Sequence, residues 1–230
     1  MAGKKLSRKS ILNYLMYSWW KYVALVVVCV LGVDVLFTMT AYRVPEEKKV
    51  EVYILNDFIA SDRLQEQLWP ELLAFDAAQE EMFVQNINLS SNDMYAYMQF
   101  STYVAAQQGD VCLMPAAEVK KLAAEGAEHA FLELTPYIER GLIDPMDIDL
   151  SAGMMRSSEG VEGLYAIPAD SLYGLLELNN DPAGSMLCVL DYNGNDDASA
   201  AVLGQMIKLY HCEKLEIQTE DTGVMQAPLF

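Results

Sequence analysis

The sequence contains only fragments of known catalytic motifs. Asp221-Thr222-Gly223 matches the triplet that carries the catalytic carboxylate of aspartic proteases, but that chemistry needs two carboxylates that share a proton. The triplet occurs once, near the C-terminus, and no apolar strand follows it. His129 and His211 lack an HExxH, triad-like or cysteine-paired context. Because no nucleophile, base and orienting residue can be combined from the sequence, we expect a protein that is not an enzyme.

A second group of polar residues is spaced like the start of a calcium loop: Asp191, Asn193, Asn195 and Asp197. Such a loop needs Gly at its sixth position and Glu at its twelfth, where this sequence has Asp196 and Val202. A turn at Asn193-Gly194 followed by a helix cap accounts for the same residues without a metal. Glycine-rich phosphate-binding motifs are also absent. The sequence therefore predicts neither a metal nor a cofactor.

The alternation of apolar segments predicts the elements that would position a binding site. Three strands are expected at residues 50–55, 82–89 and 110–115, each followed by a helix, at residues 61–75, 91–109 and 116–125. This order predicts an α/β fold with a mainly parallel sheet and helices on both faces. Further along, we expect a hairpin of two strands at 164–167 and 172–178, a strand at 186–192 and a closing helix at 197–211.

Open α/β sheets bind ligands at the carboxyl ends of their parallel strands. The residues expected at that edge are Asn56, Asp57, Phe58, Ser90, Ser91, Pro115 and Ala116, with Tyr165 and Tyr173 near them. We predict that these residues bind a ligand. The alternative is that they only cap helices and connect strands.

An apolar run from Tyr22 to Tyr42 predicts a single membrane-spanning helix, with Asp34 as its one charged residue. Its 21 residues would form a helix about 31 Å long, close to the thickness of a bilayer's hydrocarbon core. The preceding segment has basic but no acidic residues, so we expect a cytoplasmic N-terminus and an extracytoplasmic body. The alternative, a cleaved signal peptide, would have a shorter apolar stretch and a small-residue cleavage site.

The composition of the remaining chain limits its partners. Residues 44–230 contain nine Lys or Arg against 32 Asp or Glu, a net charge of −23, which excludes nucleic acid as a partner. Cys112 and Cys188 lie in apolar runs without C-x-x-C spacing, so we expect buried free thiols. The predicted organisation is a basic tail (1–21), a transmembrane helix (22–42), a linker (43–50), an α/β domain (51–217) and a C-terminal tail (218–230).

Residues 109–141, GDVCLMPAAEVKKLAAEGAEHAFLELTPYIERG, lead from a strand through one short helix to another that opens at Thr-Pro-Tyr. This segment resembles extracellular solute-binding proteins of ABC importers. Residues 162–168, EGLYAIP, are similar to the family's strand into the interlobe region, and residues 186–210 to the strand and helix that return to the first lobe. Members of the family have two lobes and about twice this length. The resemblance therefore implies a single periplasmic-binding-protein-like lobe.

Together these features predict a membrane-anchored extracytoplasmic module that binds a small solute or a protein and is associated with transport. The association with transport is implied by the resemblance alone, and the contact with the lipid bilayer is predicted from the apolar run. The alternative is a scaffold or accessory subunit of a membrane protein complex without a small-molecule ligand. In that case Asp34 would pair with a polar group of a membrane protein partner, since a carboxylate is costly in lipid.

Overall fold

The computed structural model describes residues 8–89, 94–192 and 194–212. The chain divides into two units, residues 1–43 and residues 44–230. In the first unit, helix α1 (Arg8–Thr40) contains the apolar segment Trp19–Thr40, which is long and apolar enough to cross a membrane. A signal sequence would have the same properties. Compared with the predicted span Tyr22–Tyr42, this segment starts three residues earlier and ends two residues earlier.

The second unit is built on a five-stranded sheet with the order β2-β1-β3-β7-β6. Its strands are β1 (Lys49–Ile54), β2 (Glu81–Asn86), β3 (Val111–Pro115), β6 (Ala166–Pro168) and β7 (Ser185–Val189). β1 pairs in parallel with both β2 and β3, whereas β7 runs antiparallel to β3 and to β6. The prediction of a mainly parallel sheet is confirmed, with β7 as the reversed strand.

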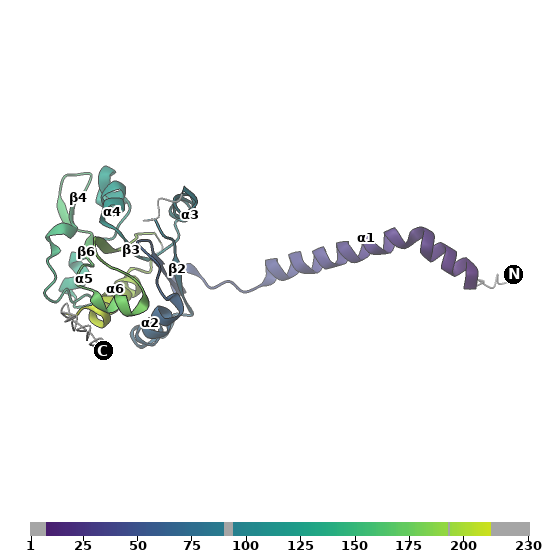
Figure 1. Ribbon diagram of the computed structural model, residues 1–230, viewed down its shortest axis with the longest axis horizontal. Coiled ribbons are helices and arrows are strands. Elements are labelled where there is room, and N and C mark those ends of the chain that lie inside the picture. Colours follow the sequence, from purple (N-terminus) through teal and green to yellow (C-terminus); the bar gives the residue numbers. More distant parts are fainter. Residues whose placement is uncertain (1–7, 90–93, 193, 213–230) are drawn as a thin grey trace, which may run out of the picture. The chain divides into compact units, whose positions relative to one another are not determined.

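Helices cover both faces of this sheet, as Figure 1 shows. α2 (Ser61–Phe75) and α6 (Asp196–Tyr210) pack on one face, where Leu64, Leu68 and Leu72 meet the even-numbered residues of β1. α3 (Met94–Ala105) and α4 (Ala116–Leu122) pack on the other face, against Tyr53 and Leu55. The alternation along β1 therefore divides the core into two layers, as expected for a strand with both faces buried.

Shorter elements connect these layers. They are the helix α5 (Thr135–Glu139), the hairpin β4 (Met154–Arg156) and β5 (Glu162–Leu164), and five 3-10 helices: η1 (Glu46–Lys48), η2 (Ala123–Glu125), η3 (Ala127–His129), η4 (Leu150–Gly153) and η5 (Tyr173–Leu178). Cys112 and Cys188 face each other across β3 and β7 as buried free thiols, which confirms their predicted burial.

One prediction about the elements was wrong. Residues 172–178 form the 3-10 helix η5 rather than a strand, so there is no hairpin around Pro168. Leu175 and Leu178 are buried at a spacing of three, which suits a 3-10 helix, and β6 pairs with β7 instead. Pro70 lies inside α2, which continues to Phe75.

Candidate functional site

The carboxyl ends of β1 and β3 border a small pocket, which we call the strand-end pocket. Its volume is about 360 Å³, and it is lined by Asn56, Asp57, Asn88, Pro115, Asp181, Ala183, Gly184 and Ser185. The structure thus brings together three of the predicted residues, Asn56, Asp57 and Pro115. The expected edge of the sheet does carry a hollow, because parallel strands end there together.

One wall of the strand-end pocket is fixed by a reciprocal pair of buried side-chain amides. Asn56 Nδ2 donates to Asn180 Oδ1 at 3.1 Å, and Asn180 Nδ2 donates to Asn56 Oδ1 at 2.9 Å. Asn56 Nδ2 also donates to the carbonyl of Asp181 at 2.8 Å, and Asn180 Nδ2 lies 3.3 Å from the carbonyl of Asp57. Asn56 therefore ties the end of β1 to the segment that leads into β7, and its side chain holds the pocket together.

Two carboxylates give the strand-end pocket its charge. Asp57 Oδ1 accepts hydrogen bonds from Phe58 N at 2.7 Å and Asn88 Nδ2 at 3.3 Å, and Asp181 Oδ1 accepts one from Ala183 N at 3.0 Å. Within the described residues, the Oδ2 atom of neither aspartate makes a hydrogen bond, and no basic side chain lines the pocket. The pocket can therefore accept hydrogen bonds from a ligand that carries N–H or O–H donors, preferably a cation.

The other predicted residues lie elsewhere. Phe58 is exposed beside the pocket, and Ala116 starts α4 next to it, where its N–H donates to the carbonyl of Gly184 at 3.0 Å. Tyr173 lies in η5 and does not line the pocket. Ser90 and Ser91 fall outside the described residues.

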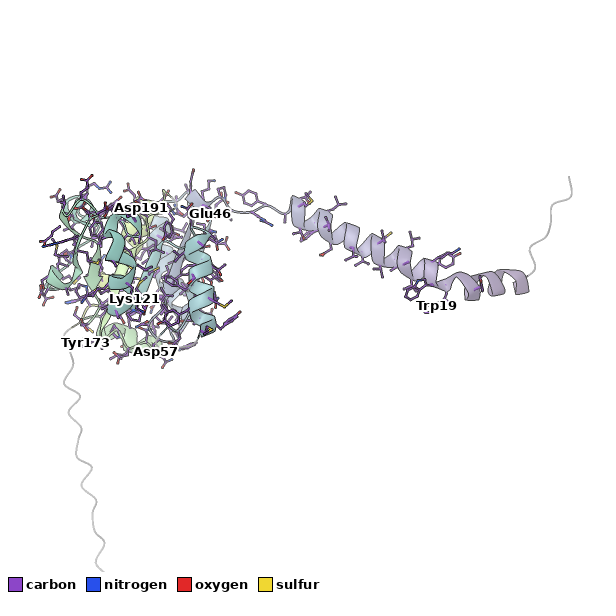
Figure 2. All side chains as sticks on the ribbon, turned by 90° about the horizontal axis from the view of Figure 1, so that it is seen from above. Trp19, Glu46, Asp57, Lys121, Tyr173 and Asp191 are labelled. Atoms are coloured by element: carbon purple, nitrogen blue, oxygen red, sulfur yellow. The ribbon has the colours of Figure 1, made fainter. Side chains whose placement is uncertain are left out.

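Tyr165 is buried and lines a separate hollow of about 460 Å³ together with Tyr137 and Asp191. Figure 2 shows Asp191 and Asp57 on opposite sides of the body, so Tyr165 does not share the strand-end pocket. Burial, followed by the nearby carboxylates of Glu133 and Glu128, raises the pKa of Tyr165.

Sequence reasoning missed Asn180 and Asp181. The signal that could have found them is the run Asn179-Asn180-Asp181-Pro182, whose residue types favour turns. Asn179 ends η5 in the left-handed conformation with φ of 62°, and this turn directs Asn180 toward Asn56. The run had been assigned to the connection after a strand, so its amide was not expected to reach β1.

The residues of the incomplete motifs have local structural roles. Asn195 Nδ2 donates to the carbonyl of Lys49 at 2.9 Å, and Asp197 forms an ion pair of 2.5 Å with Arg140. His211 Nε2 lies 2.9 Å from Asp147 Oδ1. Within the described part of the chain, no three His, Cys, Asp or Glu side chains gather in a way that could hold a metal. Asn193 and the triplet 221–223 lie outside the described residues.

Comparisons with known proteins give little further guidance. No family model and no curated protein matches the chain. A solved structure that is similar in part is an extracellular solute-binding protein family 1 from Alicyclobacillus acidocaldarius subsp. acidocaldarius DSM 446. The sequence identity is 20%, the similarity covers 52% of this chain and 27% of that one, and the TM-score is 0.32. This chain therefore matches about a quarter of the length of that structure, and a TM-score this low establishes neither a shared function nor a shared site.

Proposed function

We propose that this chain is a membrane-anchored, extracytoplasmic binding module whose strand-end pocket takes a small polar solute with hydrogen-bond donors. The observation that carries the proposal is the pair of carboxylates, Asp57 and Asp181, which border one pocket at the carboxyl ends of the strands. Their Oδ1 atoms are held by backbone N–H groups, so the carboxylates are oriented before a ligand arrives. This arrangement favours an amine-bearing solute over a neutral sugar or an anion.

The class of solute is tested by measuring the melting temperature of the full chain in detergent micelles with a panel of amines, amino acids, sugars and carboxylates. We expect amines to raise the melting temperature and carboxylates to leave it unchanged. Asp57→Asn and Asp181→Asn keep an acceptor oxygen at the Oδ1 position but remove the charge, so each should weaken amine binding at least about tenfold, as loss of a charge-assisted hydrogen bond would. The matched control is Glu139→Gln on α5, an exposed residue outside the pocket. An equal effect of all three substitutions would contradict the proposal.

The proposed anchoring rests on the segment Trp19–Thr40 and on the basic residues that precede it. Single cysteines at Ser7 and at the exposed Glu47 report the topology, in a background where Cys29 and Cys212 are replaced by Ser. A membrane-impermeant maleimide added to intact cells should label the cysteine at position 47 and not that at position 7. The reverse pattern would invert the topology, and release of a shorter labelled protein into the medium would identify a cleaved signal sequence.

A second candidate, an accessory subunit of a membrane protein complex, is favoured by the outer surface of α3. Met94, Tyr95 and Met98 on this helix are 79%, 70% and 63% exposed, and clustered exposed apolar side chains often mark contact surfaces. The substitutions Met94→Lys and Met98→Lys should then abolish co-purification of a membrane partner while leaving amine binding intact. Loss of neither property would exclude α3 as the contact surface.

A further inference from the structure

The sheet ends at β2 in a long, open edge. β2 pairs with β1 on one side, and no described strand pairs with its other side. At the end of the ladder, Ile87 N donates to the carbonyl of Ile54, the last residue of β1. Because backbone amides of successive strand residues point to opposite edges, those of Gln85 and Phe83 also face β1. The amides directed away from β1 are those of Met82, Val84 and Asn86. The open edge thus presents three outward N–H groups, and an edge of this kind is a template for another strand.

A groove of about 570 Å³ runs beside this edge, between β2 and α2. On the helix it is lined by one stripe of side chains, which includes Asp62, Glu66 and Trp69, and on the strand by residues 80–83. Figure 1 shows β2 at the margin of the sheet and α2 beside it. An extended peptide that added to β2 would lie along this groove, with alternate side chains directed toward α2.

The charges of the groove define its occupant. Asp62, Glu66 and Glu81 have no basic partner within the described residues, whereas Glu80 pairs with Lys48 at 2.6 Å. The ring of Trp69, beside these carboxylates, adds a site for a cation. Phe83, 47% exposed on the opposite face of β2 from Met82, offers an apolar contact to the alternate side chains of the same peptide.

Other segments of the protein do not fit. A second copy would bring the same acidic edge against this one. Residues 213–230 contain one Lys and four Asp or Glu, so they are also repelled. The basic residues that precede Trp19 lie across the membrane in the proposed topology. The complementary ligand is therefore a basic segment from another protein.

We propose that the groove between α2 and β2 binds an extended, lysine- or arginine-rich segment of a partner protein, which adds to the sheet as a sixth strand. Basic side chains at alternate positions contact Asp62, Glu66 and Trp69, and those between them pack on Phe83. This site is separate from the strand-end pocket and does not depend on solute binding there.

The test uses the full chain in detergent micelles and three fluorescent heptapeptides. The first alternates lysine and valine, the second alternates glutamate and valine, and the third has the first sequence with proline in place of the central valine. We expect the first peptide to bind. The third, with the same charge but without the central N–H, should bind at least about tenfold more weakly, because a missing ladder bond interrupts the added strand. The second should not bind.

Substitutions separate the charges from the backbone. The double substitution Asp62→Asn and Glu66→Gln should weaken binding at least about tenfold, whereas Glu71→Gln, on the same helix but outside the groove, should change it less than about twofold. Phe83→Ala removes the ring that packs against the peptide. Met82→Pro removes an outward N–H that Met82→Ala keeps, and neither substitution removes an amide that pairs with β1. Phe83→Ala should therefore weaken binding, and Met82→Pro should bind more weakly than Met82→Ala.

Hydrogen exchange gives a readout that does not require a variant to fold. The bound peptide should slow exchange of the amides of Met82, Val84 and Asn86 and leave those of α6 unchanged. Equal binding of the first and third peptides, or binding without slower exchange in β2, would show that the acidic surface attracts cations without strand addition, and the proposal would be overturned.

Discussion

The amide pair between Asn56 and Asn180 allows the wall of the strand-end pocket to be tested energetically. Asn56→Ala leaves Asn180 Oδ1 without its donor. Asn180→Ala leaves Asn56 Oδ1 without its donor, and it also removes the N–H group that lies 3.3 and 3.4 Å from the carbonyls of Asp57 and Phe58. Since Asn56 is 4% and Asn180 is 0% exposed, water cannot easily replace the lost partner.

Leaving a buried polar group unsatisfied costs about 1 to 3 kcal/mol. We expect Asn180→Ala to lie at the upper end of this range and Asn56→Ala near its middle, because more acceptors lose a donor in the first variant. The double variant leaves neither amide stranded, so it should be less destabilised than the sum of the single variants. The expected coupling energy is about 1 to 2 kcal/mol, within the range for residues in one hydrogen-bond network.

Urea unfolding of the full chain in mild detergent measures these energies. Trp69 reports on the body when Trp19 and Trp20 are replaced by Phe, since the sequence has three tryptophans. As a control, Asn56→Ala combined with Glu139→Ala on the exposed end of α5 should be additive within about 0.5 kcal/mol. If Asn56→Ala and Asn180→Ala are equally additive, the amides do not stabilise each other and the pocket wall is not held as described.

Three further substitutions test the packing and the charges of the body. Leu68→Ala in α2 should lower the free energy of unfolding by about 2 to 5 kcal/mol in the same urea assay, because Leu68 is 1% exposed. Gly204→Ala gains about 1 kcal/mol of helix propensity, but its Cβ would overlap the carbonyl of Leu142, at a cost of about 1 to 3 kcal/mol. We therefore expect a lower melting temperature, and a higher one would contradict the packing of α6. Hydrogen bonds, first from the Ser158 hydroxyl, hold the pKa of Glu128 below its ordinary value of 4.5. The stabilisation of the folded body by these bonds is present above that value and is lost as pH falls through the lowered pKa. Ser158→Ala should raise the pKa of Glu128 in an NMR titration.

The elements that the sequence predicted well are a helix with a clear apolar period and a strand whose two faces are both buried. The repeat of Leu64, Leu68 and Leu72 predicted α2, and the apolar run before Pro115 predicted β3. The apolar residues at 172–178 were misread as a strand because a short apolar run does not distinguish a strand from a 3-10 helix. The antiparallel direction of β7 depends on contacts with β3 and β6, which no local pattern encodes.

The strand-end residues were predictable for a similar reason. The ends of β1 and β3 follow from the strands themselves, so Asn56, Asp57 and Pro115 could be placed on one edge before the structure was known. Asn180 is 124 residues from Asn56 along the chain, and its position depends on η5 and on the left-handed Asn179 that follows it. Tyr165 was expected near the strand-end residues but lines a different hollow, because it directly precedes β6, which pairs with β7.

The strand-end pocket and the groove between α2 and β2 hold their ligands in different ways. A pocket of about 360 Å³ is at the lower limit of typical small-molecule sites, and a site that encloses little of its ligand binds it weakly. The groove between α2 and β2 does not need to enclose its ligand, because main-chain hydrogen bonds along an edge strand provide affinity at an open surface. If the body is tethered to a membrane that also carries the basic partner, the shared surface raises the effective concentration of that partner. Strand addition too weak to hold two freely diffusing proteins together would then suffice for association in the membrane.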